Sequence, residues 1–250
     1  MSLPMIYQPV ASPLRSLFVA VALASAAFAG EPQRKPAAPN WDLLLPRQGQ
    51  SQSVPQLGVG GKARTGMFGV TGEGYKFVYC LDRSGSMGGS GQRALRAVKA
   101  ELLASLRNLD TVHQFQIVFY NERPVVFNPT GVPGRLAFAN QQNKDRVERF
   151  LDAITADGGT NHEQALRTAI ALHPDVIFFL TDADQPRLTP AEITKISQLA
   201  AGITINAIEF GPGPQPAAES FLAALARENA GQYAYVDLTK LATAAEKPGR

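Results

Sequence analysis

The sequence predicts an α/β domain with a mainly parallel sheet and helices on both faces. Short runs rich in apolar, aromatic and β-branched residues, such as 76–81 (KFVYCL) and 175–181 (DVIFFLT), are typical of buried strands. The segments between such runs carry apolar residues at helical spacing. Strands that alternate with helices in this way indicate parallel pairing, because a parallel connection needs a crossover.

The predicted elements follow one another from about residue 75. Strands are expected at 76–81, 114–120, 124–127, 175–181, 203–210 and 232–236, and helices at 94–109, 145–154, 161–172, 189–202, 217–229 and 238–245. The strand at 124–127 is expected to pair antiparallel with 114–120, because only three residues separate the two. The helix after Thr189 has a threonine N-cap, Pro190 at its first position and Glu192 as the capping-box partner.

The first 29 residues have the pattern of an export signal. Arg15 precedes an uncharged apolar run at 16–29, which is shorter than the about 20 residues that a bilayer span needs. The sequence Ala27-Phe28-Ala29 is a small-x-small cleavage pattern. The alternatives are an uncleaved anchor, which would tether the domain to a membrane, and a buried helix. We expect an exported protein that is periplasmic, secreted or membrane-anchored with its domain outside the cytoplasm.

Composition divides the remainder into a linker, a domain and a tail. Pro, Gly, Gln and Ser are frequent at 30–74, so a linker without a packed helix or central strand is predicted there. The folded domain is expected at 75–238 and a short helix or tail at 239–250. A length of 250 residues, a 45% hydrophobic share and a net charge of +3 describe a soluble globular protein.

Two function classes lose support from the composition. No dense run of Lys and Arg occurs, so nucleic-acid binding is not expected. The single cysteine, Cys80, excludes an intramolecular disulfide framework and a cysteine-based zinc site. Because Cys80 lies inside a predicted strand, it is expected to be a small core residue.

Oxygen-bearing side chains follow the predicted strands. Asp82, Ser84 and Ser86 come after the first strand, Asp182 comes after 175–181, and Thr160 precedes a helix. In an open α/β sheet, ligands bind at the carboxyl ends of the strands. Magnesium takes six oxygen ligands, and two carboxylates would offset its charge while hydroxyls leave it electrophilic. The residues therefore predict a divalent-cation site with a vacant position that attracts an external carboxylate.

This pattern resembles the von Willebrand factor A domain. The segments Asp82-x-Ser84-x-Ser86, Gly159-Thr160 and Thr181-Asp182 match, in order, the three parts of that family's metal-ion-dependent adhesion site. The resemblance covers roughly residues 75–238. It implies a doubly wound, Rossmann-like sheet of six strands in the order 3-2-1-4-5-6, with one antiparallel edge strand.

The resemblance also implies a ligand set and a use. Mg²⁺, sometimes Mn²⁺ or Ca²⁺, would be bound by Ser84, Ser86 and Thr160, with Asp82 and Asp182 ligating directly or through water. The implied function is non-enzymatic binding of a protein whose Asp or Glu completes the coordination. Two departures stand out, since Ala183 replaces a common glycine and the chain continues only briefly after residue 238, which puts the family's C-terminal relay helix in doubt.

Other interpretations of the same residues stay open. The five oxygen-bearing residues could be ordinary turn and cap residues, with Thr160 capping a helix. A serine- or metal-dependent hydrolase that uses the same strand-end site is a second alternative, because 84–88 (SGSMG) resembles a nucleophile elbow. The histidine that such a serine site requires after the acid is missing, since no histidine follows His173. A purely structural envelope protein, whose linker only spaces the domain, is a third.

Four neighbouring residues carry weaker expectations. Arg83 is expected either to face a partner or to lie exposed in the loop. His162 is expected to lie on the surface in the first turn of its helix rather than to approach the rim of the metal site. Asp184 is expected to be a solvated loop acid rather than a second acid near the ion. Glu209, inside an apolar strand, suggests an edge position or a partner that the sequence does not reveal.

Overall fold

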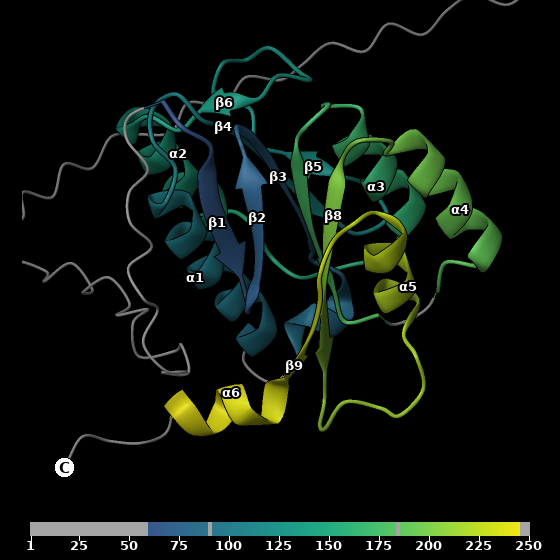
Figure 1. Cartoon of the computed structure of the whole chain (residues 1–250). Helices are drawn as coiled ribbons and strands as arrows, with labels where there is room; N and C mark the ends of the chain where they lie inside the picture. Colours follow the sequence, from purple (N-terminus) through teal and green to yellow (C-terminus); the bar gives the residue numbers. More distant parts are fainter. Residues whose placement is uncertain (1–59, 90–91, 184–185, 246–250) are drawn as a thin grey trace, which may run out of the picture. The chain divides into compact units, whose positions relative to one another are not determined.

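The computed structural model describes residues 60–89, 92–183 and 186–245, which form a sheet flanked by helices (Figure 1). The strands are β1 (Ala63–Met67), β2 (Val70–Gly74), β3 (Lys76–Asp82), β4 (Gln114–Tyr120), β5 (Val125–Val126), β6 (Ala137–Phe138), β7 (Val176–Thr181), β8 (Thr204–Gly211) and β9 (Tyr233–Asp237). The helices are α1 (Arg93–Arg107), α2 (Gln141–Asp152), α3 (His162–Ile170), α4 (Pro190–Leu199), α5 (Phe221–Glu228) and α6 (Leu238–Ala245).

The main sheet has the order β5-β4-β3-β7-β8-β9, which confirms the expected 3-2-1-4-5-6 arrangement. The pairs β3–β4, β3–β7, β7–β8 and β8–β9 are parallel, and β5 is antiparallel to β4. The expectation of six strands is incomplete, because β6 also pairs antiparallel with β4 and makes the sheet seven-stranded. Two residues in a loop carry too little periodicity to be recognised as a strand.

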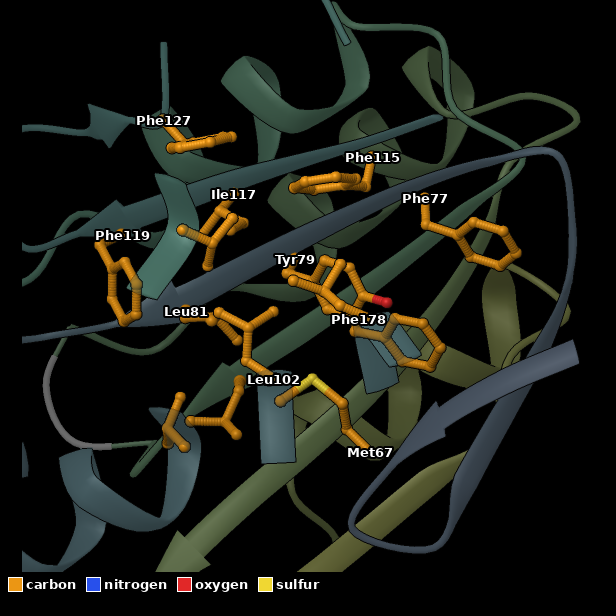
Figure 2. Close-up of a cluster of buried hydrophobic side chains, with 14 of the residues drawn as sticks. Met67, Phe77, Tyr79, Leu81, Leu102, Phe115, Ile117, Phe119, Phe127 and Phe178 are labelled. Atoms are coloured by element: carbon orange, nitrogen blue, oxygen red, sulfur yellow. The ribbon is translucent and has the colours of Figure 1, made fainter. Parts of the chain in front are cut away.

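The sheet is covered on both faces, as its apolar strands require. Figure 1 shows α1 and α2 on one side and α3, α4 and α5 on the other. Tyr79 and Leu81 of β3 face the first side, while Val78 and Cys80 face the second. The buried Cys80 is thus a core residue, as expected. Figure 2 shows the first side, where aromatic rings from β3, β4 and β7 gather beside Leu102 of α1.

Most boundaries agree with the sequence pattern to within two residues, but α2 begins at Gln141 rather than 145, α5 begins at Phe221 rather than 217, and α4 ends at Leu199 rather than 202. Asn140 caps α2, since its side chain accepts a hydrogen bond from the Asn143 amide at 2.9 Å. The first turn is polar and therefore adds nothing to an apolar periodicity. The capping box predicted at Thr189 is confirmed, with both reciprocal hydrogen bonds to Glu192 present.

The prediction that 30–74 is an unpacked linker is wrong for its last part, because β1 and β2 form an antiparallel hairpin. β1 lies along α1, and β2 lies beside β7 and β8. Met67 and Val70 are buried, and the Thr65 hydroxyl donates to the Ser105 carbonyl at 2.7 Å. The glycine-rich strands lack alternating apolar residues, so tertiary burial rather than local pattern decides their structure.

Replacing Gly72 by alanine is expected to lower the free energy of unfolding by about 1–3 kcal/mol, because an added methyl overpacks the hairpin against the sheet. A Cβ on Gly72 would lie 2.5 Å from Val176 Cγ1. Urea denaturation measures the effect. Gly213→Ala is the matched control, since a Cβ there meets nothing within 4 Å. Equal stability of the two variants would contradict close packing of the hairpin.

No helix in the described ranges is both long and apolar enough to cross a membrane. Residues 1–59, which include the predicted export signal and most of the predicted linker, lie outside the described residues, as do Asp184 and residues 246–250.

Candidate metal site at the carboxyl edge of the sheet

The carboxyl ends of the parallel strands place four polar side chains in one row. Asp82 of β3 pairs in register with Tyr120 of β4, and Thr181 of β7 pairs with Glu209 of β8. The Thr181 hydroxyl donates to Asp82 Oδ2 at 2.6 Å, which joins the two halves of the row. Because parallel strands end at the same edge, residues almost 100 positions apart in sequence become neighbours here.

Asp82 is the buried centre of this row. Its Oδ1 accepts the Ser84 amide at 2.7 Å, and the residue has no exposed surface. The pKa of Asp82 is raised to about 6. Burial is the main cause, and its effect, together with a smaller contribution from the Asp182 carboxylate, outweighs the lowering of the pKa by the hydrogen bonds from Thr181 and Ser84. An ionised carboxylate in this position is costly, and a bound cation would relieve that cost.

The two serines after β3 present their hydroxyls to each other. One turn of 3-10 helix at Gly85–Gly88 follows Ser84, and Met87 anchors the turn by pointing into the core. Ser84 Oγ and Ser86 Oγ lie 3.0 Å apart. Neighbouring ligands of an octahedral Mg²⁺ site, with metal–oxygen distances of about 2.1 Å, are separated by about the same distance. The serine pair therefore fits two adjacent coordination positions.

The Gly158-Gly159-Thr160 loop is attached to the serine loop by its backbone. The Gly85 amide donates to the Gly158 carbonyl at 2.9 Å. Gly158 has φ +69°, and a Cβ there would lie 2.9 Å from Asn121 Nδ2, so glycine is required. Asn161, rather than Thr160, caps α3 by accepting the Gln164 amide at 3.0 Å. This corrects the alternative in which Thr160 is the cap residue of that helix.

Asp182 follows β7 at the same edge and is half-buried. Its carboxylate is near enough to contribute to the raised pKa of Asp82. The next residue, Ala183, has φ +55°, a conformation that favours glycine and costs other residues roughly 1–2 kcal/mol. The departure from the family's glycine is thus accommodated with local strain, and the Ala183 amide donates to the Thr181 hydroxyl at 3.1 Å.

The set of donors suits a hard cation. Within the described ranges, no three His, Cys, Asp or Glu side chains come together as a metal-binding group. The five residues predicted as ligands supply two carboxylates, from Asp82 and Asp182, and three neutral hydroxyls instead. Such oxygen donors are the ligands of Mg²⁺, Mn²⁺ and Ca²⁺, whereas zinc in structural sites prefers sulfur and imidazole.

The structure corrects the expectation for His162, which is buried rather than on the surface. The Tyr120 hydroxyl and His162 Nδ1 lie 3.1 Å apart, and the ring packs against Phe179 and Phe221. Its helical spacing from Leu166 and Ala169, both buried, was a signal in the sequence for this inward orientation. The buried histidine helps to fix the start of α3, two residues after Thr160.

Arg83 and Glu209 are also better defined by the structure than by the sequence. The side chain of Arg83 is only 14% exposed and forms an ion pair with Asp157, so the expected exposed loop position is wrong. Glu209 lies in β8, which has β7 and β9 on its two sides, and so it does not belong to an edge strand. Its carboxylate accepts a hydrogen bond from the Tyr233 hydroxyl at 2.8 Å, which identifies the partner that the sequence left open.

Comparison with known proteins finds a family model, related sequences and solved structures that are similar to this chain. Residues 77–185 match the family model of the von Willebrand factor type A domain. Over 126 residues the chain is 29% identical to inter-alpha-trypsin inhibitor heavy chain H4 of Bos taurus, a match that covers 50% of this chain and 12% of that protein. The human protein of that name is 29% identical over 104 residues, or 42% of this chain and 10% of that protein.

Two solved structures share the fold. The von Willebrand factor type A protein from Catenulispora acidiphila gives a TM-score of 0.57 at 20% identity, covering 76% of this chain and 51% of that one. The protein BatB from Bacteroides thetaiotaomicron gives 0.51 at 15% identity, covering 70% of this chain and all of that one. Residues 77–185 thus match the von Willebrand factor type A domain, and the strand order of the sheet and these two solved structures agree with its fold.

Proposed function

We propose that the carboxyl edge of the sheet binds a divalent cation, Mg²⁺ or alternatively Mn²⁺ or Ca²⁺. Ser84, Ser86 and Thr160 would supply hydroxyl ligands, and Asp82 and Asp182 would ligate directly or through water. The observation that carries the proposal is the fully buried Asp82 carboxylate. It accepts hydrogen bonds from the Ser84 amide, just after β3, and from the Thr181 hydroxyl, at the end of β7. A cation stabilises a buried carboxylate that lies beside the hydroxyl-bearing ends of two strands.

The bound cation would serve a non-enzymatic binding function. Neutral hydroxyl ligands leave the ion electrophilic, so a carboxylate from another protein would complete its coordination. A hydrolase is less well supported. The Ser84 and Ser86 hydroxyls are hydrogen-bonded to each other, and the buried His162 ring is hydrogen-bonded to the Tyr120 hydroxyl. A serine nucleophile needs a base within hydrogen-bond reach.

We further propose that this binding takes place outside the cytoplasm. The support is the sequence at 1–29, which has an uncharged apolar run followed by the Ala27-Phe28-Ala29 cleavage pattern. Under this proposal the domain is periplasmic, secreted or tethered by an uncleaved segment, and its partner presents an exposed Asp or Glu. Cell fractionation, with N-terminal sequencing of the exported form, would test cleavage after Ala29.

From the proposed metal site we expect the chain to bind Mg²⁺ and the removal of a ligand hydroxyl to weaken Mg²⁺ binding. Ser86→Ala and Thr160→Ala are each expected to weaken the Mg²⁺ affinity by about tenfold or more, because loss of a donor leaves a coordination position to water. Isothermal titration calorimetry measures the affinity. Thr168→Ala is the matched control, since that hydroxyl bonds the Gln164 carbonyl within α3 at 2.8 Å.

The binding function needs a second measurement with a carboxylate probe. A capped peptide with a central Asp is compared with the same peptide carrying Asn, by NMR shifts of the residues at 82–86 and 158–160. We expect shifts only with the Asp peptide and only with Mg²⁺ present, and EDTA should reverse them. Absence of Mg²⁺ binding would overturn the site, whereas Mg²⁺ binding without any carboxylate effect would overturn only the binding function.

A further inference from the structure

We propose that Arg83, Asp157 and Asn121 form a positioning brace for the metal site, a proposal that rests on the metal binding proposed above. The brace would hold the loop of Ser84 and Ser86 at the separation from the loop of Thr160 that a shared cation requires. Arg83 lies between Asp82 and Ser84 in the sequence, and Asp157 lies three residues before Thr160. The brace thus connects positions beside the proposed ligands without using a ligand itself.

The ion pair is the first part of the brace. Arg83 Nη1 lies 2.6 Å from Asp157 Oδ1 and also donates to the Thr155 carbonyl at 3.3 Å. The Arg83 side chain is 14% exposed, whereas the Asp157 side chain is 58% exposed. A guanidinium with two acceptors in a mostly buried position has a defined orientation, unlike an arginine on a flexible surface loop.

Asn121 brings a third loop into the same cluster. Its Nδ2 donates to Asp157 Oδ1 at 2.7 Å and to the Asp157 carbonyl at 3.0 Å. Its Oδ1 accepts the Arg123 amide at 2.9 Å. Asn121 is buried at the end of β4, the strand that pairs with β3. One carboxylate oxygen of Asp157 therefore receives hydrogen bonds from the ends of two neighbouring strands.

Backbone hydrogen bonds transmit this geometry to the proposed ligands. The Asp157 amide donates to the Arg83 carbonyl at 2.9 Å, and the Gly85 amide donates to the Gly158 carbonyl at 2.9 Å. The two loops are thus bonded at both the side-chain and the main-chain level. Outer groups of this kind orient metal ligands, and their loss typically weakens metal affinity about 10–100-fold.

The charge of Arg83 makes the inference testable by the sign of the effect. A positive charge beside a cation site is repulsive, so Coulomb's law alone predicts that its removal strengthens Mg²⁺ binding. The buried Arg83 Nε has no hydrogen-bond partner within the described part of the chain, so keeping this arginine in place also costs folding free energy. The brace predicts the opposite effect, because removing Arg83 frees the two loops to move apart.

The test is Arg83→Met, with Mg²⁺ affinity measured by isothermal titration calorimetry and the melting temperature measured without metal. We expect the dissociation constant to rise about tenfold or more. The metal-free melting temperature should change little, because the exposed Asp157 can be hydrated once its partner is lost. An unchanged or lower dissociation constant would overturn the brace, and so would a metal-free loss of stability that accounts for the weaker binding.

Matched variants separate the brace from other causes. Arg227→Met removes an exposed arginine–carboxylate pair, formed with Glu219, and should leave Mg²⁺ affinity unchanged. Arg83→Lys restores one cationic donor and should recover part of the affinity. Equal effects of Arg83→Met and Arg227→Met would contradict a specific role.

A second pair of variants tests the brace if Arg83→Met does not fold. Asp157→Ala and Asp157→Asn remove the same charge, but only Asn keeps an oxygen that Arg83 and Asn121 can bind. We expect Asp157→Asn to retain more Mg²⁺ affinity than Asp157→Ala, and equal losses would overturn the brace. If the unmodified chain itself fails to bind Mg²⁺, the proposed metal site fails, a result distinct from failure of the brace.

Discussion

Asp82→Asn is expected to stabilise the metal-free chain at neutral pH and to abolish its response to Mg²⁺. Burial raises the pKa of Asp82 to about 6, so at pH 7 the folded chain holds an ionised carboxylate that its surroundings disfavour. The shift from the ordinary value of 3.8 corresponds to roughly 3 kcal/mol at pH 7, which the neutral Asn side chain would avoid.

The same group gives the metal-free chain a pH dependence of a defined sign. Because the folded-state pKa lies above the unfolded one, the folded chain binds more protons between about pH 4 and pH 6. The free energy of unfolding should therefore fall as the pH rises through this range. Urea denaturation at a series of pH values, with EDTA present, should show this slope in the unmodified chain and lose it in Asp82→Asn.

Magnesium should reverse the ranking of the two proteins. At a Mg²⁺ concentration 100-fold above the dissociation constant, the unmodified chain should gain about 2.7 kcal/mol, while Asp82→Asn gains none. Asp152→Asn, a change of an exposed acid on α2, should keep both the pH slope and the Mg²⁺ response. If Asp82→Asn is less stable than the metal-free unmodified chain at pH 7, burial of the ionised carboxylate does not destabilise the fold.

Phe178→Ala is expected to lower the free energy of unfolding by about 3–5 kcal/mol, because it leaves a cavity in the apolar layer between the sheet and α1. Phe178 has no exposed surface and lies on β7, a central strand. Its ring stacks on Tyr79 with centroids 5.4 Å apart and an interplanar angle of 16°, and Figure 2 shows the two rings side by side. Chemical denaturation at pH 7 measures the loss.

Phe138→Ala is the matched control for this prediction. It removes the same side chain from β6, where Phe138 is 51% exposed and lies at the margin of the sheet. Surface substitutions of this type usually change stability by no more than about 0.5 kcal/mol. A similar loss for both variants would mean that Phe178 is not the centre of a packed layer.

The prediction of the main sheet succeeded where each strand is buried on both faces. Residues 176–181 consist of six buried positions in succession, and this continuity distinguishes a central parallel strand from a loop or a surface helix. The N-terminal cap of α4 at Thr189 was also predicted correctly, because a capping box involves only two residues that are three positions apart. Local pattern is sufficient for elements of these two kinds.

Prediction failed where an element depends on distant partners. The β1–β2 hairpin has few apolar residues, and its burial comes from α1, β7 and β8. The orientation of His162 depends on Tyr120, and that of Arg83 depends on Asp157, 74 positions away. The packing of the hairpin and the Arg83–Asp157 pair have no signature in the local composition, because loop closure and sheet pairing bring the partners together. For His162 the helical spacing from Leu166 and Ala169 was a local signal that the prediction did not use.

By itself the sequence determined the α/β class, the order of the elements and the positions of the oxygen-bearing residues at strand ends, because hydrophobic periodicity and turn chemistry are local properties. Only the tertiary structure decided that Asp82 is fully buried, that Ser84 and Ser86 lie 3.0 Å apart, and that Arg83 is paired with Asp157. Burial and separation in space depend on how the parallel strands pair, and that pairing joins segments far apart in the chain.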